Sequence, residues 1–125
     1  MTEVGRLGWE AVGASVAAGD LYLEPGVASR CAKRCAEFAA ELRALRDEAK
    51  ALGRVDGFGP LPSGVALATK FAKKAVGGDY SMVDAIGDHI VEVERMQATF
   101  EQIEAMYGAS EQRGVDGITG AGGGL

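Results

Sequence analysis

This 125-residue sequence has few positive charges: 13 Lys and Arg stand against 18 Asp and Glu, for a net charge of -5. A protein that binds nucleic acid gains most of its affinity from a basic surface that neutralises phosphates. The acidic balance therefore argues against nucleic acid as a partner.

Long apolar runs are missing as well. No stretch approaches the roughly 20 apolar residues that a bilayer crossing needs, so we expect no stable membrane insertion. Residues 1–19 are interrupted by glycines and carry a single basic side chain, which does not predict a cleaved signal peptide. If the chain leaves the cell, we expect a route that does not read such a signal.

Motifs for metal or redox chemistry are scarce. Cys31 and Cys35 are four residues apart, which is not the spacing of a redox Cys-x-x-C motif, and they suit small apolar positions on one helix face. The only histidine, His89, has no cysteine near it and no Glu-x-x-His pairing of the kind that di-iron bundles use. We therefore predict no catalytic residue, no metal and no cofactor, and we expect that the protein is not an enzyme.

Apolar residues that recur in steps of three and four predict two long helices. The first runs from Pro25, which suits a first helical turn, to Leu52, where the next residue is a glycine suited to a left-handed cap. The second begins at Ser81, which forms a capping box with Asp84, and runs to about Arg113. The predicted core or interface stripe comprises Cys31, Cys35, Phe38, Leu42, Leu45 and Leu52 on the first helix, and Ile86, Ile90, Val93, Phe100 and Ile103 on the second.

A shorter helix over residues 63–76, capped by Ser63, is predicted to connect the two long ones. Two amphipathic helices joined in this way are expected to fold back on each other. We thus predict an all-α fold, in which an antiparallel helical hairpin over residues 25–113 completes a helical bundle with a partner. Residues 1–24 are expected to be irregular or a short helix, and residues 114–125 a flexible Gly-rich tail.

Tyr107 and Glu111 lie one turn apart near the end of the second long helix, so they face the same way. This Tyr-x-x-x-Glu spacing, after a helical hairpin in a small acidic chain, matches the signal of type VII secretion substrates of actinobacteria. Residues 25–111 resemble the WXG-like superfamily, with Gly57-Phe58-Gly59 where its namesake members have Trp-x-Gly. The resemblance implies a non-enzymatic secretion substrate or targeting partner, with Tyr107 and Glu111 as the export signal.

The resemblance also implies the partners and the location. Secreted WXG-like proteins pair as homodimers or heterodimers in four-helix bundles, so the expected partner is a related helical protein or an effector, with a secretion ATPase as a further contact. We expect the apolar stripes to remain exposed in the monomer and to form the interface. The expected location is outside the cell or at the cell envelope. The alternative is a cytosolic adaptor, chaperone or immunity protein for a neighbouring effector.

Overall fold

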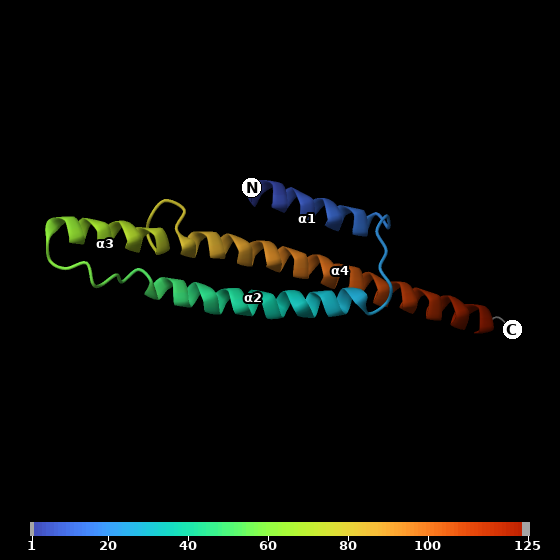
Figure 1. Cartoon of the computed structure of the whole chain (residues 1–125). Coiled ribbons are helices and arrows are strands. Elements are labelled where there is room, and N and C mark those ends of the chain that lie inside the picture. Colours follow the sequence, from blue (N-terminus) through green and yellow to red (C-terminus); the bar gives the residue numbers. More distant parts are fainter. Residues whose placement is uncertain (1, 124–125) are drawn as a thin grey trace. The chain divides into compact units, whose positions relative to one another are not determined.

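The computed structural model describes the backbone of residues 2–123 and the side chains of residues 8–108. Over that range it is all-helical, with four helices: α1 (Thr2–Ala17), α2 (Val27–Ala51), α3 (Pro62–Ala75) and α4 (Met82–Gly123) (Figure 1). The all-α class is thus confirmed, as are two long helices with a shorter one between them. α1 adds a helix in the segment for which the sequence left an irregular structure or a short helix open.

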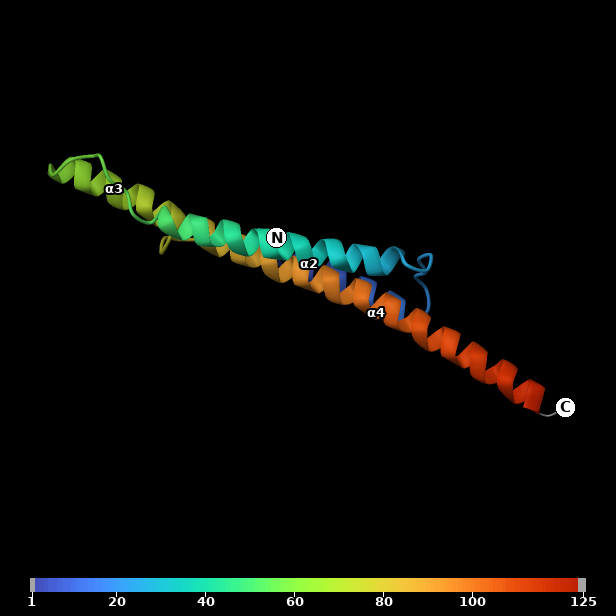
Figure 2. The same ribbon diagram turned by 90° about the horizontal axis from the view of Figure 1, so that it is seen from below.

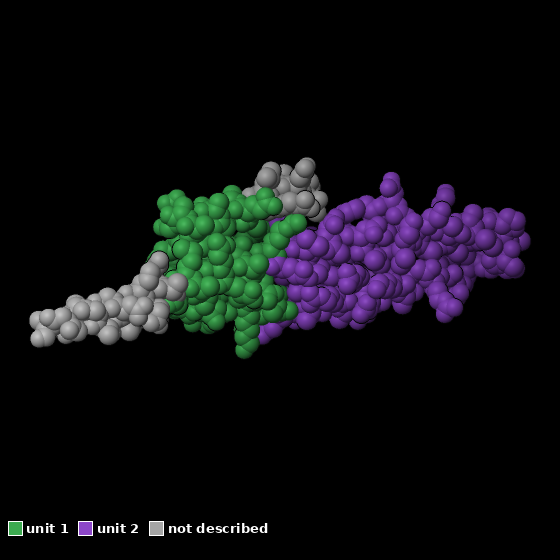
Figure 3. All heavy atoms as spheres, turned by 180° about the vertical axis from the view of Figure 1, so that it is seen from behind, with its two compact units in different colours: residues 1–36, 95–125 green, residues 37–94 purple. Residues whose placement is uncertain are grey.

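The chain divides into two compact units, which are described separately. Unit 1 comprises residues 1–36 and 95–125, and unit 2 comprises residues 37–94 (Figure 3). α1 belongs to unit 1 and α3 to unit 2, whereas α2 and α4 each contribute to both. Each unit is therefore built on one segment of α2 and one segment of α4.

α1 ends in a Schellman motif. The N–H of Asp20 donates to the carbonyl of Ser15 (2.9 Å), and the N–H of Gly19 donates to the carbonyl of Val16 (3.1 Å). Gly19 has a φ of 79°, the left-handed conformation that this cap requires and that glycine adopts without strain. The cap satisfies the last carbonyls of α1 and ends the helix before residues 20–26 lead to α2.

The core of unit 1 forms where three helices meet. Val16 of α1, Ala28 of α2 and Ile103 of α4 are buried together. Trp9 of α1 also meets Phe100 of α4 edge to face, with ring centroids 5.9 Å apart. α1 is therefore held to unit 1 by apolar contact, despite the glycines in its sequence.

In unit 2 the second part of α2 runs antiparallel to the start of α4, and the two lie side by side in both views (Figures 1 and 2). Leu42 and Ala49 of α2 are buried, as are Ile86, Ile90 and Val93 of α4. These residues form an apolar line on each helix, which is the arrangement that amphipathic helices need to pack on each other.

The start of α4 has the predicted capping box. The N–H and the hydroxyl of Ser81 both donate to Asp84 Oδ2 (3.1 Å each), and the N–H of Asp84 donates to Ser81 Oγ (3.5 Å). These bonds satisfy helix N-terminal donors that have no partner within the helix.

α2 ends differently from the prediction. In place of a left-handed cap at Gly53, the last turn tightens, with the N–H of Leu52 donating to Ala49 and that of Gly53 to Lys50 (3.0 and 3.2 Å). A Cβ at Gly53 would lie 3.1 Å from Val76 Cγ2. Glycine is therefore suited to this position because the side chain of Val76, just after α3, and the carbonyl oxygen of Lys50 lie close to it.

α3 also begins one residue earlier than predicted. Leu61, in an extended conformation, is the N-cap and makes no side-chain cap bond, so Ser63 does not have the predicted capping role. Pro62 occupies the start of the helix, where its missing N–H leaves no bond unmade.

α4 continues to Gly123, through residues 114–123, for which the sequence predicts a flexible tail. The chain has no proline after Pro62 that would remove a backbone donor. Each glycine costs a helix interior about 1 kcal/mol relative to alanine, which weakens a helix without blocking it. The glycines of this segment therefore weaken the helix, whereas no proline interrupts it.

Candidate interaction surface

Large apolar side chains are left exposed mainly in unit 2. Fourteen are exposed among the described residues, and because only Leu21 and Tyr22 belong to unit 1, the other twelve belong to unit 2. Contiguous apolar patches on a protein surface mark sites of interaction. Unit 2 is therefore the part of the chain that offers a docking surface.

One line of exposed residues follows α2 through unit 2. Phe38, Leu45 and Leu52 are 50%, 48% and 53% exposed, and the exposed residues Glu41 and Glu48 lie between them. The steps of three and four place Phe38, Glu41, Leu45 and Glu48 on one face of α2. Leu52, in the tightened turn just after the helix, continues the spacing. We call these five residues the α2 seam. Its apolar side chains alternate with carboxylates over about 21 Å of helix.

The predicted stripe on α2 is divided between core and surface. Cys35 and Leu42 are buried and Cys31 is partly buried, whereas the stripe residues Phe38, Leu45 and Leu52 belong to the exposed seam. The buried line of α2 consists mostly of alanine: Ala28, Ala32, Cys35, Ala39, Leu42 and Ala49. Because small residues fill this line, the larger apolar residues are left at its edge.

The predicted stripe on α4 lies mostly inside the fold. Ile86, Ile90, Val93 and Ile103 are buried, and Phe100 is partly buried against the core of unit 1. These residues stabilise the chain itself. The apolar surface that remains open to a partner is therefore mainly on α2, on α3 and on the loops at either end of α3.

One charged residue of α2 forms an ion pair with α4, whereas the carboxylates of the α2 seam do not. Arg43 Nη2 lies 2.6 Å from Glu94 Oε1, which joins α2 to α4 within unit 2. Arg43 is two residues from both Glu41 and Leu45, a spacing that places it on a different side of the helix from the seam. Within the described side chains, neither Glu41 nor Glu48 forms an ion pair. The seam carboxylates are thus open to a partner.

A second apolar surface lies on α3. Phe58 stacks on Phe71, with ring centroids 5.7 Å apart and planes 6° from parallel, yet the two residues are 41% and 46% exposed. Gly64 allows this contact, because a Cβ there would collide with the carbonyl oxygen of Phe58. Figures 1 and 2 show α3 extending past the C-terminal end of α2, with residues 52–61 running along it.

Tyr107, one half of the predicted export signal, makes contacts within unit 1. Its hydroxyl accepts a hydrogen bond from the backbone N–H of Leu23, and its ring meets that of Tyr22 edge to face, with centroids 5.4 Å apart. Glu111, the other half, lies outside the residues whose side chains are described. The export signal therefore stays a prediction from the sequence.

The two cysteines border an open apolar hollow of about 490 Å³ in unit 1. Burial raises the pKa of the Cys35 thiol, and the charge of Cys31 raises it further. This environment favours the protonated thiol, which is neither a good nucleophile nor a metal ligand. The hollow is lined by Val27, Arg30, Cys31, Arg34, Cys35 and Phe100.

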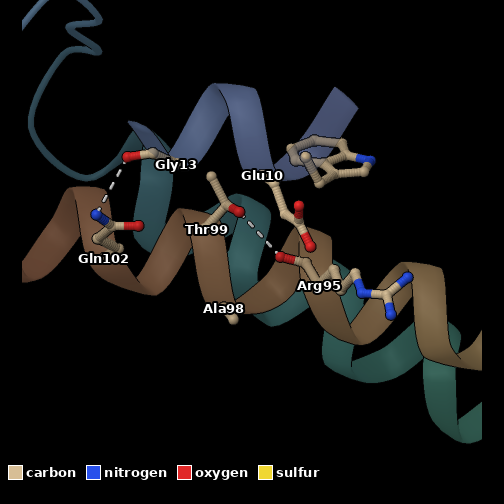
Figure 4. Close-up of a pocket in the computed structure, with 7 residues that line it drawn as sticks. Glu10, Gly13, Arg95, Ala98, Thr99 and Gln102 are labelled. Carbon is tan, nitrogen blue, oxygen red and sulfur yellow. Dashed lines mark hydrogen bonds between the residues drawn. The ribbon is translucent and has the colours of Figure 1, made fainter. Parts of the chain in front are cut away.

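A shallow pocket of about 270 Å³ lies between α1 and α4 in unit 1 (Figure 4). Two of its polar side chains bond to backbone: Thr99 Oγ1 donates to the carbonyl of Arg95 (3.0 Å), and Gln102 Nε2 donates to that of Gly13 (3.4 Å). The second bond joins the two helices. We therefore interpret this pocket as part of the packing of α1 on α4.

Among the residues that the structure describes, no helix is both long enough and apolar enough to cross a membrane. In the same part of the chain, no three His, Cys, Asp or Glu side chains gather as a metal site would need.

No protein-family model matches this chain, and comparisons with curated proteins and with solved structures gave no match either. Proposals about its function therefore rest on the residues of this chain.

Proposed function

We propose that this chain is a non-enzymatic helical interaction protein that docks another helix along the α2 seam. The observation that supports this most is the half exposure of Phe38, Leu45 and Leu52 on one helix face. A helix laid along the seam would bury a line of about 21 Å, as in a coiled coil. α2 and α4 of unit 2 then form part of a helical bundle that the partner completes.

The energy available from the seam indicates how large the interface must be. Fully burying a large apolar side chain contributes roughly 1.5–3 kcal/mol, so covering three half-exposed residues contributes about 3 kcal/mol. Association costs at least about 4 kcal/mol in lost translational and rotational freedom. The seam alone is therefore too small to hold a complex, and a partner must also cover the exposed apolar residues of α3.

We further propose that the complex is a substrate or a targeting partner of a type VII secretion system. The support is the Tyr-x-x-x-Glu spacing of Tyr107 and Glu111 in a small acidic helical chain. The partner would be a second copy, a related helical protein or an effector. In this proposal the interface makes the complex and the C-terminal part of α4 addresses it for export.

Export tests the secretion half of the proposal. In a host with an active type VII system, the chain should reach the culture filtrate or the cell envelope, and Tyr107→Ala together with Glu111→Ala should abolish export. Tyr107→Phe is the control, because it keeps the aromatic ring and removes only the hydroxyl that Leu23 binds. If export is unchanged in the double alanine variant, the signal is misassigned. A wild-type chain that stays in the cytosol with its partner would favour an adaptor or chaperone.

Partner binding tests the interface half. Leu45→Lys places a charge in the middle of the seam, whereas Ala40→Lys adds the same charge to an exposed position on another face of α2. In extracts of the native host, wild type and Ala40→Lys should elute in a complex and Leu45→Lys as a single chain. A complex that survives Leu45→Lys would show that the seam is not the interface.

A further inference from the structure

α3 carries a basic counterpart of the α2 seam. Leu67, Lys70, Phe71 and Lys74 are spaced i, i+3, i+4 and i+7, which places them on one face of the helix, and all four are exposed. Phe58, stacked on Phe71, extends the apolar part of this face. We call these five residues the α3 seam. It combines apolar rings with ammonium groups, as the α2 seam combines apolar side chains with carboxylates.

The positive charge of the α3 seam is not neutralised within its own segment. Residues 57–78 contain three lysines and no acid. Asp79 is the one carboxylate that borders the shallow groove shared by Lys70, Lys73 and Lys74. Within the described side chains, neither Lys70 nor Lys74 forms an ion pair. The face is therefore suited to an acidic and apolar partner surface.

We infer that the partner is a second copy of this chain, whose α3 seam docks on the α2 seam. This inference rests on the proposed function, because it names the occupant of the same surface. Apolar residues of one copy meet apolar residues of the other, and Lys70 and Lys74 meet Glu41 and Glu48. The carboxylates are about 10.5 Å apart along the helix and the lysines about 6 Å, a difference that flexible lysine side chains can span.

In the inferred dimer both seams of each copy are used at once. The α2 seam and α3 are each about 21 Å long, and α3 continues past the end of α2 (Figures 1 and 2). A two-fold axis near the connection between them places α3 of each copy beside α2 of the other. Such an isologous dimer contains the α2–α3 contact twice, which also supplies the apolar area that one seam lacks.

A second copy offers a complementary surface to each seam, which a membrane or a single acidic helix does not. An anionic membrane would attract the lysines of α3, but it would repel the carboxylates of the α2 seam and leave its apolar residues uncovered. An unrelated acidic helix would likewise cover α3 only. Complementary charge on two surfaces of one chain therefore favours self-association.

A charge exchange on the full chain tests this inference. One variant carries Glu41→Lys and Glu48→Lys, and the other carries Lys70→Glu and Lys74→Glu. Each variant alone opposes like charges in both contacts, so its self-association, measured by sedimentation equilibrium, should weaken roughly ten- to a hundredfold. Mixed one to one, the two variants restore opposite charges in both contacts. The mixture should therefore associate about as tightly as wild type.

The outcomes separate this inference from the proposed function. A monomeric wild type at micromolar concentration overturns the second copy and leaves a different helical partner for the seam. A wild type that associates regardless of the exchanges, or a mixture that stays monomeric, also overturns it. Loss of partner binding in Leu45→Lys supports the α2 seam as the interface whether the partner is a second copy or a different helical protein.

Two milder measurements keep the test decisive if an exchanged variant fails to fold by circular dichroism. Glu41→Gln with Glu48→Gln removes charge without reversing it, and self-association should weaken less and lose most of its dependence on salt. Salt should weaken the wild-type dimer. An association that salt does not change in wild type would contradict the role of these charges.

Discussion

The Tyr107 hydroxyl accepts a hydrogen bond from the backbone N–H of Leu23, so the segment before α2 is joined to α4 within unit 1. Tyr107→Phe leaves that N–H without its partner, and the chain should lose about 1 kcal/mol of stability against urea. The amide of Leu23 should also exchange faster with deuterium. Tyr22→Phe is the control, because Tyr22 is 71% exposed and its change should fall within about 0.5 kcal/mol. Unchanged exchange at Leu23 would argue against the bond.

The capping box predicts the effect of Asp84 on α4. Asp84→Ala removes the acceptor for the N–H and hydroxyl of Ser81 and should destabilise the chain by about 1 kcal/mol in urea unfolding. Asp84→Glu restores the acid that most capping boxes use, so its loss should be smaller. Equal losses in the two variants would show that the carboxylate has no capping role.

Two glycines predict opposite effects of the same substitution. Gly64→Ala drives a methyl group into the carbonyl oxygen of Phe58 and should cost roughly 1–3 kcal/mol, with loss of the Phe58–Phe71 stack. Gly87 lies within α4 with open space around a Cβ, so Gly87→Ala should raise stability by up to about 1 kcal/mol. Thermal unfolding of the two variants measures both signs. A neutral Gly64→Ala would mean that residues 58–59 do not lie against α3.

The cysteines should differ in their reactivity and its dependence on pH. Cys35 is buried and its pKa is raised, so iodoacetamide should modify the more accessible Cys31 first. The raised pKa means that the folded chain favours the neutral thiol. This preference stabilises the fold fully at pH values below the pKa of the Cys35 thiol in the unfolded chain. The stabilisation is lost as the pH rises through the pKa of the same thiol in the folded chain. Labelling of Cys35 should therefore follow at more alkaline pH. Mass spectrometry with Cys31→Ser and Cys35→Ser separates the sites, and equal rates would contradict the burial.

Periodicity predicted most of the helices because local signals mark them. Ser81 and Asp84 mark the start of α4 through its backbone donors, and the structure has the helix there. The predicted start at Pro25 was wrong by two residues, because Gly26 adopts a left-handed φ of 86° and α2 begins at Val27. The predicted stripe on α4 lies mostly in the core, because the large apolar residues of α4 are the ones that pack against the other helices. The signals at Gly53 and Ser63 were ambiguous. A glycine can mark a left-handed cap or a place where another residue packs closely, and Gly53 is the second case. Either Ser63 or Pro62 could mark the start of α3, and the helix begins at Pro62.

The candidate surface was harder to predict, because hydrophobicity alone does not say which apolar residues face inward. On α2 the alanines form the buried line, so Phe38, Leu45 and Leu52 are left exposed. The alternation of these residues with Glu41 and Glu48 was a signal available in the sequence. Whether this alternating face is buried or exposed depends on which side of α2 packs against α4. Tertiary packing decides that side, and local helix propensity does not.

The central claim is that the α2 seam stands open in the isolated chain and is covered by a partner helix. Binding of an apolar-surface dye measures this most directly, in dilute wild type and in the variant with Phe38→Ser, Leu45→Ser and Leu52→Ser. Wild type should bind the dye, and binding should fall as a partner or a second copy covers the seam. The triple variant should keep its helicity and bind clearly less dye, with the exposed apolar residues of α3 still binding some, whereas Ala40→Ser should behave as wild type. A dilute, monomeric wild type that binds no dye would contradict the claim.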